Sequence, residues 1–310
     1  MTSTLSCRAR LIRALLQVRR RVTGWNSPAL ELRTKAARAD HLIPLPADVR
    51  FEREMADKVP VELVAPPKCD SKTVILYVPG GGGVIGLHNM HRRMIARICR
   101  LANCRAWAVH YRLAPEHPFP AALEDCLQVW DWLLRTEKKS NLVLAGDSIG
   151  GNIVMAMMLS VTAKGQPLPA RAVCISPVLD LQGTGESFRA DRDPAAPRGF
   201  ALSVMRSYAG SHDLVDPLLS PIHGEFRGLP PLFAVAGGDE LVLSDVLYLR
   251  EKAELSGVDV KVSIYRGMWH LWILLAPWLP EAAAAIDEIA RFVRTNEAED
   301  QSTAMDGRAG

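Results

Sequence analysis

The sequence lacks the long apolar runs and the paired cysteines that would mark a membrane protein or a disulfide-linked one. None of its apolar runs reaches the roughly 20 residues that a membrane-spanning helix needs. The longest candidate, residues 269–279, is interrupted by Pro277 and predicts a buried loop or a helical turn. The six cysteines form neither a CxxC pair nor a Cys/His cluster, so no zinc site and no disulfide framework is predicted. We therefore expect a cytoplasmic protein with no integral membrane segment, no metal and no organic cofactor.

The chain also carries only a small excess of charge of one sign. The 310 residues carry a formal net charge of +3, and beyond the first segment no stretch combines basic with aromatic residues as a nucleic-acid-binding face does. We therefore expect no nucleic-acid partner. The hydrophobic share of 48% and the charged share of 23% are typical of globular domains, and a chain of this length can bury a sizeable core.

Residues 1 to about 23 form a basic segment, and the first acidic residue of the chain is Glu31. Several of its apolar residues fall on one helical face: Leu11, Ile12, Leu15 and Leu16. Arg13 breaks the apolar stretch, which argues against a secretory signal peptide. Three interpretations stay open: a helix that packs its apolar face on the rest of the protein, which we favour, an organelle-targeting presequence, and a helix on a membrane surface.

Beyond residue 50, predicted strands and helices alternate with short connections. Phe51–Val64 predicts an edge hairpin, and the β-branched run Thr73–Val78 predicts a strand buried on both faces. Further strands are predicted directly before Ser148 and at residues 105–111, 172–178, 232–237 and 258–265, with helices at 90–101, 119–134, 150–163, 243–255 and 280–293. This alternation predicts an α/β fold with a mainly parallel central sheet and helices on both faces.

The expected domain organisation has a main domain over residues 51–296, preceded by a helical segment over residues 1–50. A long insertion at about residues 180–221 breaks the strand–helix rhythm and holds one predicted helix, Ala201–Tyr208. Long insertions at the carboxyl ends of strands are where ligand-covering elements sit, so we expect the insertion and the N-terminal helices to form a lid. The polar residues 297–310 predict a disordered tail.

The stretch LVLAGDSIGG, from Leu142 to Gly151, predicts a buried strand that turns sharply into a helix at Ser148. A serine between small residues at such a turn matches the G-x-S-x-G nucleophile elbow. Glycines allow the sharp turn, which holds the serine hydroxyl outward in a strained conformation. The pentapeptide alone is also compatible with an ordinary strand–helix turn, so the prediction depends on partners elsewhere in the chain.

A serine nucleophile needs a histidine base and a carboxylate, which follow it in the order acid, then histidine, in α/β-hydrolases. Asp239 follows the predicted strand 232–237, and His270 follows the next one, 258–265. Glu240 and Asp245 are the alternative acids, and Asp239 is favoured. No other histidine follows a strand late in the chain, which makes His270 the candidate base.

A glycine run, Gly80–Gly83, directly follows the predicted strand Thr73–Val78. Backbone N–H groups on such a loop are accessible to an oxyanion because no side chain blocks the approach. The N–H of Ile149, at the start of the helix after Ser148, is a further donor. Phosphate binding is the competing interpretation, but neither GxxxxGK[ST] nor GxGxxG follows the strand.

Together these motifs resemble the hormone-sensitive lipase-like family (family IV) of carboxylesterases, which has the α/β-hydrolase fold. The similarity runs from about Val74 to Val293. It rests on His270 and five stretches: PGGGGVIG from Pro79, YRLAPEHPFP from Tyr111, the elbow GDSIGGN, DPLLSP from Asp216, and Gly238-Asp239.

The resemblance implies an esterase with the triad Ser148, Asp239 and His270, and an oxyanion hole made by the amides of Gly81, Gly82 and Ile149. It also implies a lid, an acyl-enzyme intermediate and apolar ester substrates of short to medium chain length. The apolar surroundings of His270 and the position of the glycine loop suggest the substrate contacts Gly83, Trp269 and Leu271.

Two positions depart from the family pattern HGGGFVIG. Pro79 replaces the histidine that helps to brace the loop, and Gly83 replaces the usual aromatic residue, which removes bulk beside the acyl site. The alternatives are a ligand-binding protein of the same fold and a lactonase or amidase with the same triad. A homodimer, peripheral membrane contact and organelle targeting stay open.

Overall fold

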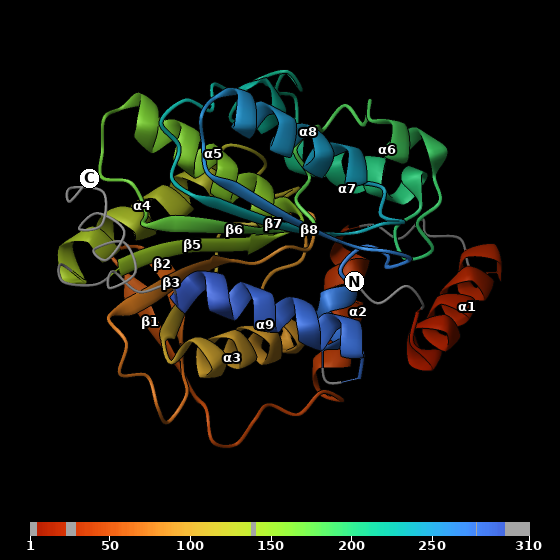
Figure 1. Ribbon diagram of the computed structural model, residues 1–310, viewed down its shortest axis with the longest axis horizontal. Coiled ribbons are helices and arrows are strands. Elements are labelled where there is room, and N and C mark those ends of the chain that lie inside the picture. Colours follow the sequence, from red (N-terminus) through yellow and green to blue (C-terminus); the bar gives the residue numbers. More distant parts are fainter. Residues whose placement is uncertain (1–4, 23–28, 138–140, 277, 295–310) are drawn as a thin grey trace, which may run out of the picture.

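The computed structural model describes residues 5–22, 29–137, 141–276 and 278–294, and an eight-stranded sheet lies at its centre (Figure 1). Most of the strands follow β-branched and aliphatic runs of the sequence, because these side chains pack well on a pleated surface. Their bounds are β1 Arg50–Ala56, β2 Val59–Ala65, β3 Thr73–Val78, β4 Arg105–Val109, β5 Asn141–Asp147, β6 Arg171–Ile175, β7 Leu232–Gly237 and β8 Val260–Tyr265.

The strand order across the sheet is β1-β2-β4-β3-β5-β6-β7-β8. The hairpin β1–β2 is antiparallel, and β2 pairs antiparallel with β4. All other neighbours are parallel. The carboxyl ends of β3 to β8 therefore meet at one edge of the sheet, where ligands bind in open α/β sheets. The α/β fold predicted from the sequence is confirmed.

Helices cover both faces of this sheet (Figure 1). On one face lie α3 Asn89–Ala102 and α9 Pro280–Arg294, and on the other lie α4 Ala121–Thr136, α5 Ile149–Ala163 and α8 Leu243–Leu255. All six residues of β3 are buried, and the five from Val74 to Val78 alternate between two hydrophobic clusters, one on each face. Leu76 belongs to the cluster with α5, and Tyr77 belongs to the cluster with α3. This alternation is the period of two of a strand buried on both sides.

The segments outside this frame are the N-terminal helices α1 Cys7–Val22 and α2 Ala29–Asp40 and the insertion after β6. The insertion holds α7 Arg198–Ala209, which extends the predicted helix, and also the short helix α6 Glu186–Ala190. The sequence did not predict α6, since five residues are too few for a helical period to be recognised. The tail predicted to be disordered, 297–310, lies outside the described residues.

We had expected the apolar residues of α1 to face the protein, but only some of them do. Ile12 and Leu16 pack against the core, but Leu11 is 63% exposed and Leu15 is 61% exposed. Consecutive residues are rotated by about 100° around a helix, so the two pairs point in different directions. Within the described residues, no helix is long and apolar enough to cross a membrane.

Candidate active site

Ser148 stands at the turn from β5 into α5, in a strained backbone conformation with φ 53° and ψ −119°. Two hydrogen bonds fix the turn. The Ser148 N–H donates to the Ile175 carbonyl (2.8 Å), and the Asn152 N–H donates to the Ser148 carbonyl (3.1 Å). A non-glycine residue persists in this region only where its surroundings determine the conformation. The sharp strand-to-helix turn predicted from the sequence is therefore present.

The glycines on either side of Ser148 are sterically required. A Cβ atom on Gly146 would lie 2.5 Å from the carbonyl oxygen of Gly150, and one on Gly150 would lie 2.1 Å from the carbonyl oxygen of Val78. Both distances are well below van der Waals contact, so β5, the start of α5 and the end of β3 approach this closely only without side chains.

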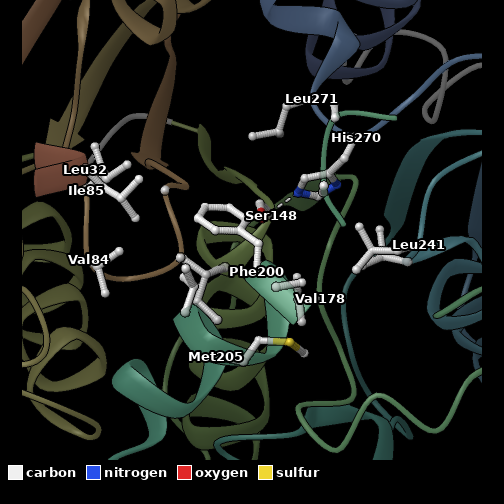
Figure 2. Close-up of a pocket in the computed structure, with 18 of the residues that line it drawn as sticks. Leu32, Val84, Ile85, Ser148, Val178, Phe200, Met205, Leu241, His270 and Leu271 are labelled. Carbon is white, nitrogen blue, oxygen red and sulfur yellow. Dashed lines mark hydrogen bonds between the residues drawn. The ribbon is translucent and has the colours of Figure 1, made fainter. Parts of the chain in front are cut away.

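His270 lies in the turn between β8 and the 3₁₀ helix η2 Trp272–Leu275. The Ser148 hydroxyl donates a hydrogen bond to His270 Nε2 at 2.9 Å (Figure 2). The structure thus brings together two of the predicted site residues, which are 122 positions apart in the chain.

The carboxylate next to His270 belongs to Glu240, and not to Asp239 as we had expected. His270 Nδ1 lies 3.3 Å from Glu240 Oε2. The other carboxylate oxygen, Oε1, accepts hydrogen bonds from the Ser176 hydroxyl and the Gly237 N–H, both at 2.7 Å. Glu240 is only 1% exposed, so its partners at the ends of β6 and β7 hold it in one orientation.

Asp239 points elsewhere because it has a different partner. Its carboxylate forms an ion pair with Arg13 of α1, which also donates to the Gly267 carbonyl at 2.8 Å. Asp245, the second alternative acid, accepts hydrogen bonds from the N–H groups of Leu179 and Asp180. The sequence could not separate Asp239 from Glu240 by strand position, because both follow β7.

Charge and burial act in opposite directions on His270. Burial alone would lower its pKa, but the hydrogen bond with Glu240 and the negative charge of that residue raise the pKa above its ordinary value. Asp193 and Asp147 contribute further in the same direction. The net effect is a histidine whose protonated form is stabilised.

Asp193, from the insertion, is a buried carboxylate that sequence reasoning missed. It accepts hydrogen bonds from four backbone N–H groups, those of Ala195, Ala196, Leu241 and His270. Burial raises its pKa to about 6, while the nearby His270 acts against this shift. Asp193 therefore ties the insertion to the two loops that carry Glu240 and His270.

The glycine loop lies opposite Ser148, and its backbone is in the left-handed region at Gly81 (φ 92°), Gly82 (φ 66°) and Gly83 (φ 70°). Val84 and Ile85 both donate their N–H groups to the Gly81 carbonyl, which closes a tight turn. Among the described residues, none accepts a hydrogen bond from the N–H groups of Gly81, Gly82 or Ile149. All three residues line the same pocket as Ser148.

A buried carboxylate, Asp147, braces the start of this loop. It accepts hydrogen bonds from the Tyr77 hydroxyl (2.6 Å) and the Gly80 N–H (3.0 Å), and His91 Nε2 lies 3.1 Å away. Burial would raise the pKa of Asp147, but His91, Tyr77 and Gly80 lower it overall. In addition, the Tyr111 hydroxyl donates to the Pro79 carbonyl at 2.7 Å. The loop is therefore held from both sides without a histidine at position 79.

The space beside Gly83 is not empty. The ring of Tyr208, on α7, occupies the space beside it: a Cβ atom on Gly83 would lie 2.4 Å from Tyr208 Cδ2. Tyr208 is 1% exposed and packs edge-on against Phe119. A tyrosine from the insertion thus supplies the bulk that the loop lacks.

The pocket above Ser148 is apolar and has a volume of about 240 Å³. Side chains from α2, the glycine loop and α7, among them Phe200, line the pocket together with Ser148 (Figure 2). The lining includes Leu32, Val84, Ile85, Val178, Phe200, Val204, Met205, Leu241 and Leu271. Of the three predicted substrate contacts, Leu271 lines the pocket, whereas Trp269 is buried in the core and Gly83 faces Tyr208.

No group of three or more His, Cys, Asp or Glu side chains in the described part of the chain is arranged to hold a metal ion. The groups that the site brings together are a hydroxyl on a histidine, a histidine on a carboxylate, and backbone donors facing an apolar cavity.

Comparison with known proteins gives the same fold and assigns an activity. Residues 75–274 match the alpha/beta hydrolase fold family. An acetyl-hydrolase of Streptomyces hygroscopicus is 35% identical over 237 residues, which cover 76% of this chain and 79% of that protein. An esterase of Acinetobacter venetianus is 34% identical over 227 residues, covering 71% of this chain and 74% of that protein.

A solved structure extends the similarity to nearly the whole chain. The crystal structure of an esterase from the bacterial hormone-sensitive lipase family superimposes with a TM-score of 0.87 at 36% identity, covering 94% of this chain and 98% of that one. The chain therefore belongs to the α/β-hydrolase family, in its hormone-sensitive lipase branch, and is a carboxylic ester hydrolase.

Proposed function

We propose that this protein hydrolyses small apolar carboxylic esters with a Ser148–His270–Glu240 triad. The observation that carries the proposal is the chain of contacts from the Ser148 hydroxyl to His270 Nε2 (2.9 Å) and from His270 Nδ1 to Glu240 Oε2 (3.3 Å). This series of contacts begins in an apolar pocket that is also lined by backbone donors. Nucleophile, base and orienting acid in this order are the parts that acyl transfer through a serine requires.

In the first step, Ser148 Oγ attacks the ester carbonyl carbon while His270 Nε2 takes the hydroxyl proton. The carbonyl oxygen gains a negative charge, and the N–H groups of Gly81, Gly82 and Ile149 donate hydrogen bonds to it. The C–O bond to the alcohol then breaks, and His270 gives its proton to the leaving oxygen. A water molecule attacks the acyl-enzyme by the same sequence, which releases the acid and restores Ser148.

Glu240 keeps the imidazole in the productive orientation. By accepting a hydrogen bond from His270 Nδ1–H, it leaves Nε2 unprotonated and able to accept the serine proton. Its charge also stabilises the imidazolium that forms in each step, which agrees with the raised pKa of His270. We thus assign to Glu240 the role that we had expected for Asp239.

The size of the pocket favours short acyl groups. Its volume of about 240 Å³ lies below the range of about 300–1,000 Å³ that is typical of sites for drug-sized ligands. An acetyl-hydrolase among the relatives agrees with a small acyl group. Burial of each added methylene contributes about 0.8 kcal/mol, or about fourfold in kcat/KM, until the pocket is full.

Two related functions differ from ester hydrolysis in measurable ways: turnover of an ester excludes the first, and parallel assays with an amide and a lactone separate the second. A ligand-binding protein of this fold would hold an ester without turnover, and an amidase or lactonase would prefer other carbonyl substrates. The described site holds a complete set of serine, histidine and carboxylate, which favours the enzyme over the binding protein.

The test is a chain-length series of p-nitrophenyl esters from acetate to decanoate, with Ser148→Ala as the control. We expect kcat/KM to rise over the first members and then to fall, and we expect the control to lose both turnover and labelling by a fluorophosphonate. A Ser148→Ala variant that retains activity would overturn the assignment. A rise continuing to decanoate would overturn the proposed acyl length but not the triad.

A further inference from the structure

Helix α1 presents an apolar stripe to solvent. Leu11, Leu15, Val18 and Val22 are 63%, 61%, 58% and 75% exposed. Their spacing of four, three and four residues places them within an arc of about 60° on the helix, at about 100° of rotation per residue. Scattered exposed apolar residues are common, but a continuous stripe along a whole helix marks an interaction surface.

Arginines border this stripe on both sides. At the same helical rotation, Arg8 and Arg19 lie on one side of it and Arg10 and Arg21 on the other, and all four are exposed. The helix carries six arginines and no acidic residue. An apolar stripe flanked by arginines is the pattern of a helix that lies in the interface of a lipid bilayer, where guanidinium groups reach the phosphates.

An exposed indole lies beside the N-terminal end of the same helix. The Trp278 carbonyl accepts a hydrogen bond from Arg8, and its side chain is 45% exposed. Tryptophan is enriched at membrane–water boundaries because its ring is apolar and its N–H is polar.

The opposite face of α1 is attached to the loops of the active site. Arg13 pairs with Asp239 and bonds the Gly267 carbonyl, and Arg20 pairs with Asp191 (2.6 Å) and donates to the Asp193 carbonyl (2.6 Å). Polar contacts thus fix the inner face, while none of the residues that the structure describes covers the apolar outer face. In Figure 1, α1 lies at the margin of the molecule, on the side where the carboxyl ends of the strands and the insertion helices lie.

From this arrangement we propose that α1 docks the enzyme on an anionic lipid surface, with the stripe Leu11–Leu15–Val18–Val22 inserted and the flanking arginines on lipid phosphates. The ester substrates of the proposed function partition into such a surface, so the docked enzyme meets them at high local concentration. This consequence rests on the proposed function, whereas lipid binding itself does not.

Charge decides between a lipid surface and a second copy of the chain. Pairing two copies through the stripe would bring two arginine-bordered helices together, and like charges at such a contact repel. An anionic surface instead attracts each arginine. The stripe alone would suit either occupant, and the arginines favour the lipid.

The experiment is sedimentation of the full chain with large vesicles of phosphatidylcholine, with and without one third phosphatidylglycerol. We expect binding to the anionic vesicles, at least about tenfold weaker binding to the neutral ones, and release by high salt. The triple variant Leu11→Ser, Leu15→Ser, Val18→Ser removes most of the stripe and should weaken binding at least about tenfold.

The matched control replaces three exposed leucines elsewhere, Leu42, Leu247 and Leu255, by serine and should bind as the natural chain does. Hydrolysis of a soluble acetate ester, which both triple variants should retain, shows that they are folded. Ser148→Ala should lose hydrolysis and bind vesicles normally. Absence of binding to anionic vesicles, or equal binding by both triple variants, would overturn the proposal. A concentration-dependent dimer that the stripe variant abolishes would point to a second copy instead.

Discussion

His270 and Glu240 face each other across the loops after β8 and β7, with 3.3 Å between Nδ1 and Oε2, whereas the neighbouring Asp239 pairs with Arg13. Adjacent side chains in such a turn point in different directions, so one carboxylate points into the site and the other points away from it. The partners that hold each one differ accordingly: Ser176 and Gly237 for Glu240, and α1 for Asp239.

This arrangement predicts different costs for removing the two charges. Glu240→Gln should lower kcat by about 10³- to 10⁴-fold, because the amide no longer favours the productive tautomer of His270. Asp239→Asn should lower kcat by less than about tenfold. It should cost about 1 kcal/mol of stability or less, as expected for a partly exposed ion pair.

Steady-state kinetics on one soluble ester and thermal unfolding of both variants make the comparison. Arg13→Gln serves as the matched control, since it removes the same ion pair from the other side and should resemble Asp239→Asn. Activity lost in Asp239→Asn and retained in Glu240→Gln would restore the acid expected from the sequence.

A second prediction concerns pH. His270 must be neutral to accept the serine proton, so kcat/KM should fall as the pH drops through its pKa, which Glu240 raises above the ordinary value. In Glu240→Gln the hydrogen bond to a charged group and the charge itself are lost. The acid limb of the residual activity should therefore move to lower pH.

The pH profile of kcat/KM for the natural chain and for Glu240→Gln checks this prediction, with Asp239→Asn as a control that keeps the natural limb. If the limb in Glu240→Gln moved upward or stayed in place, Glu240 would not be the group that sets the pKa of His270.

The sheet and its flanking helices could be predicted from the sequence because they follow from local pattern. The run Thr73–Val78 became β3 with the predicted bounds, and so did Leu232–Gly237 as β7. The serine turn followed from two glycines whose missing side chains the structure requires. These features depend on neighbours in sequence or on a period of two or 3.6 residues.

Contacts between distant segments could not be predicted in this way. Glu240 and Asp239 follow the same strand, and only their partners decide which one faces His270: Ser176 after β6 and Gly237 on β7 for Glu240, and Arg13 on α1 for Asp239. Likewise, nothing in the sequence places Tyr208 beside Gly83, or the Asp193 carboxylate on the His270 N–H. Both residues lie in the insertion, whose sequence has no periodic pattern from which its course could be predicted. The exposure of Leu11 and Leu15 depends on how α1 is tethered through Arg13 and Arg20.

The contact between Gly83 and Tyr208 gives a third prediction. Gly83→Ala should destabilise the protein by about 2–5 kcal/mol, since the left-handed backbone costs about 1–2 kcal/mol and overlap with the Tyr208 ring costs about 1–3 kcal/mol more. In a Tyr208→Ala background only the backbone cost remains, so the same substitution should destabilise less.

A double-mutant cycle in urea measures this coupling. The two single variants and the double variant should show an interaction free energy of about 1–3 kcal/mol. Gly86→Ala is a suitable control, because a Cβ atom there would lie 3.7 Å from Leu113 Cδ1, which is ordinary contact. Additive effects at positions 83 and 208 would mean that the ring does not fill the space beside Gly83.

The last prediction concerns Pro79, where the family pattern has histidine. In this protein the loop is braced by Asp147 on the Gly80 N–H and by the Tyr111 hydroxyl on the Pro79 carbonyl, and both contacts use backbone atoms of the loop. Pro79→His keeps these backbone atoms, so we expect esterase turnover to be unchanged or raised by up to about tenfold, as expected for better-aligned oxyanion donors.

Tyr111→Phe is the informative comparison, because it removes a brace without touching the loop itself. It should lower kcat and leave KM less affected, since misaligned oxyanion donors weaken stabilisation of the transition state and not substrate binding. Parallel measurements of kcat and KM for Pro79→His, Tyr111→Phe and the double variant test whether Tyr111 holds the loop. A large loss of turnover in Pro79→His would mean that the proline ring itself shapes the loop, and that Tyr111 and Asp147 alone do not hold the donors in place.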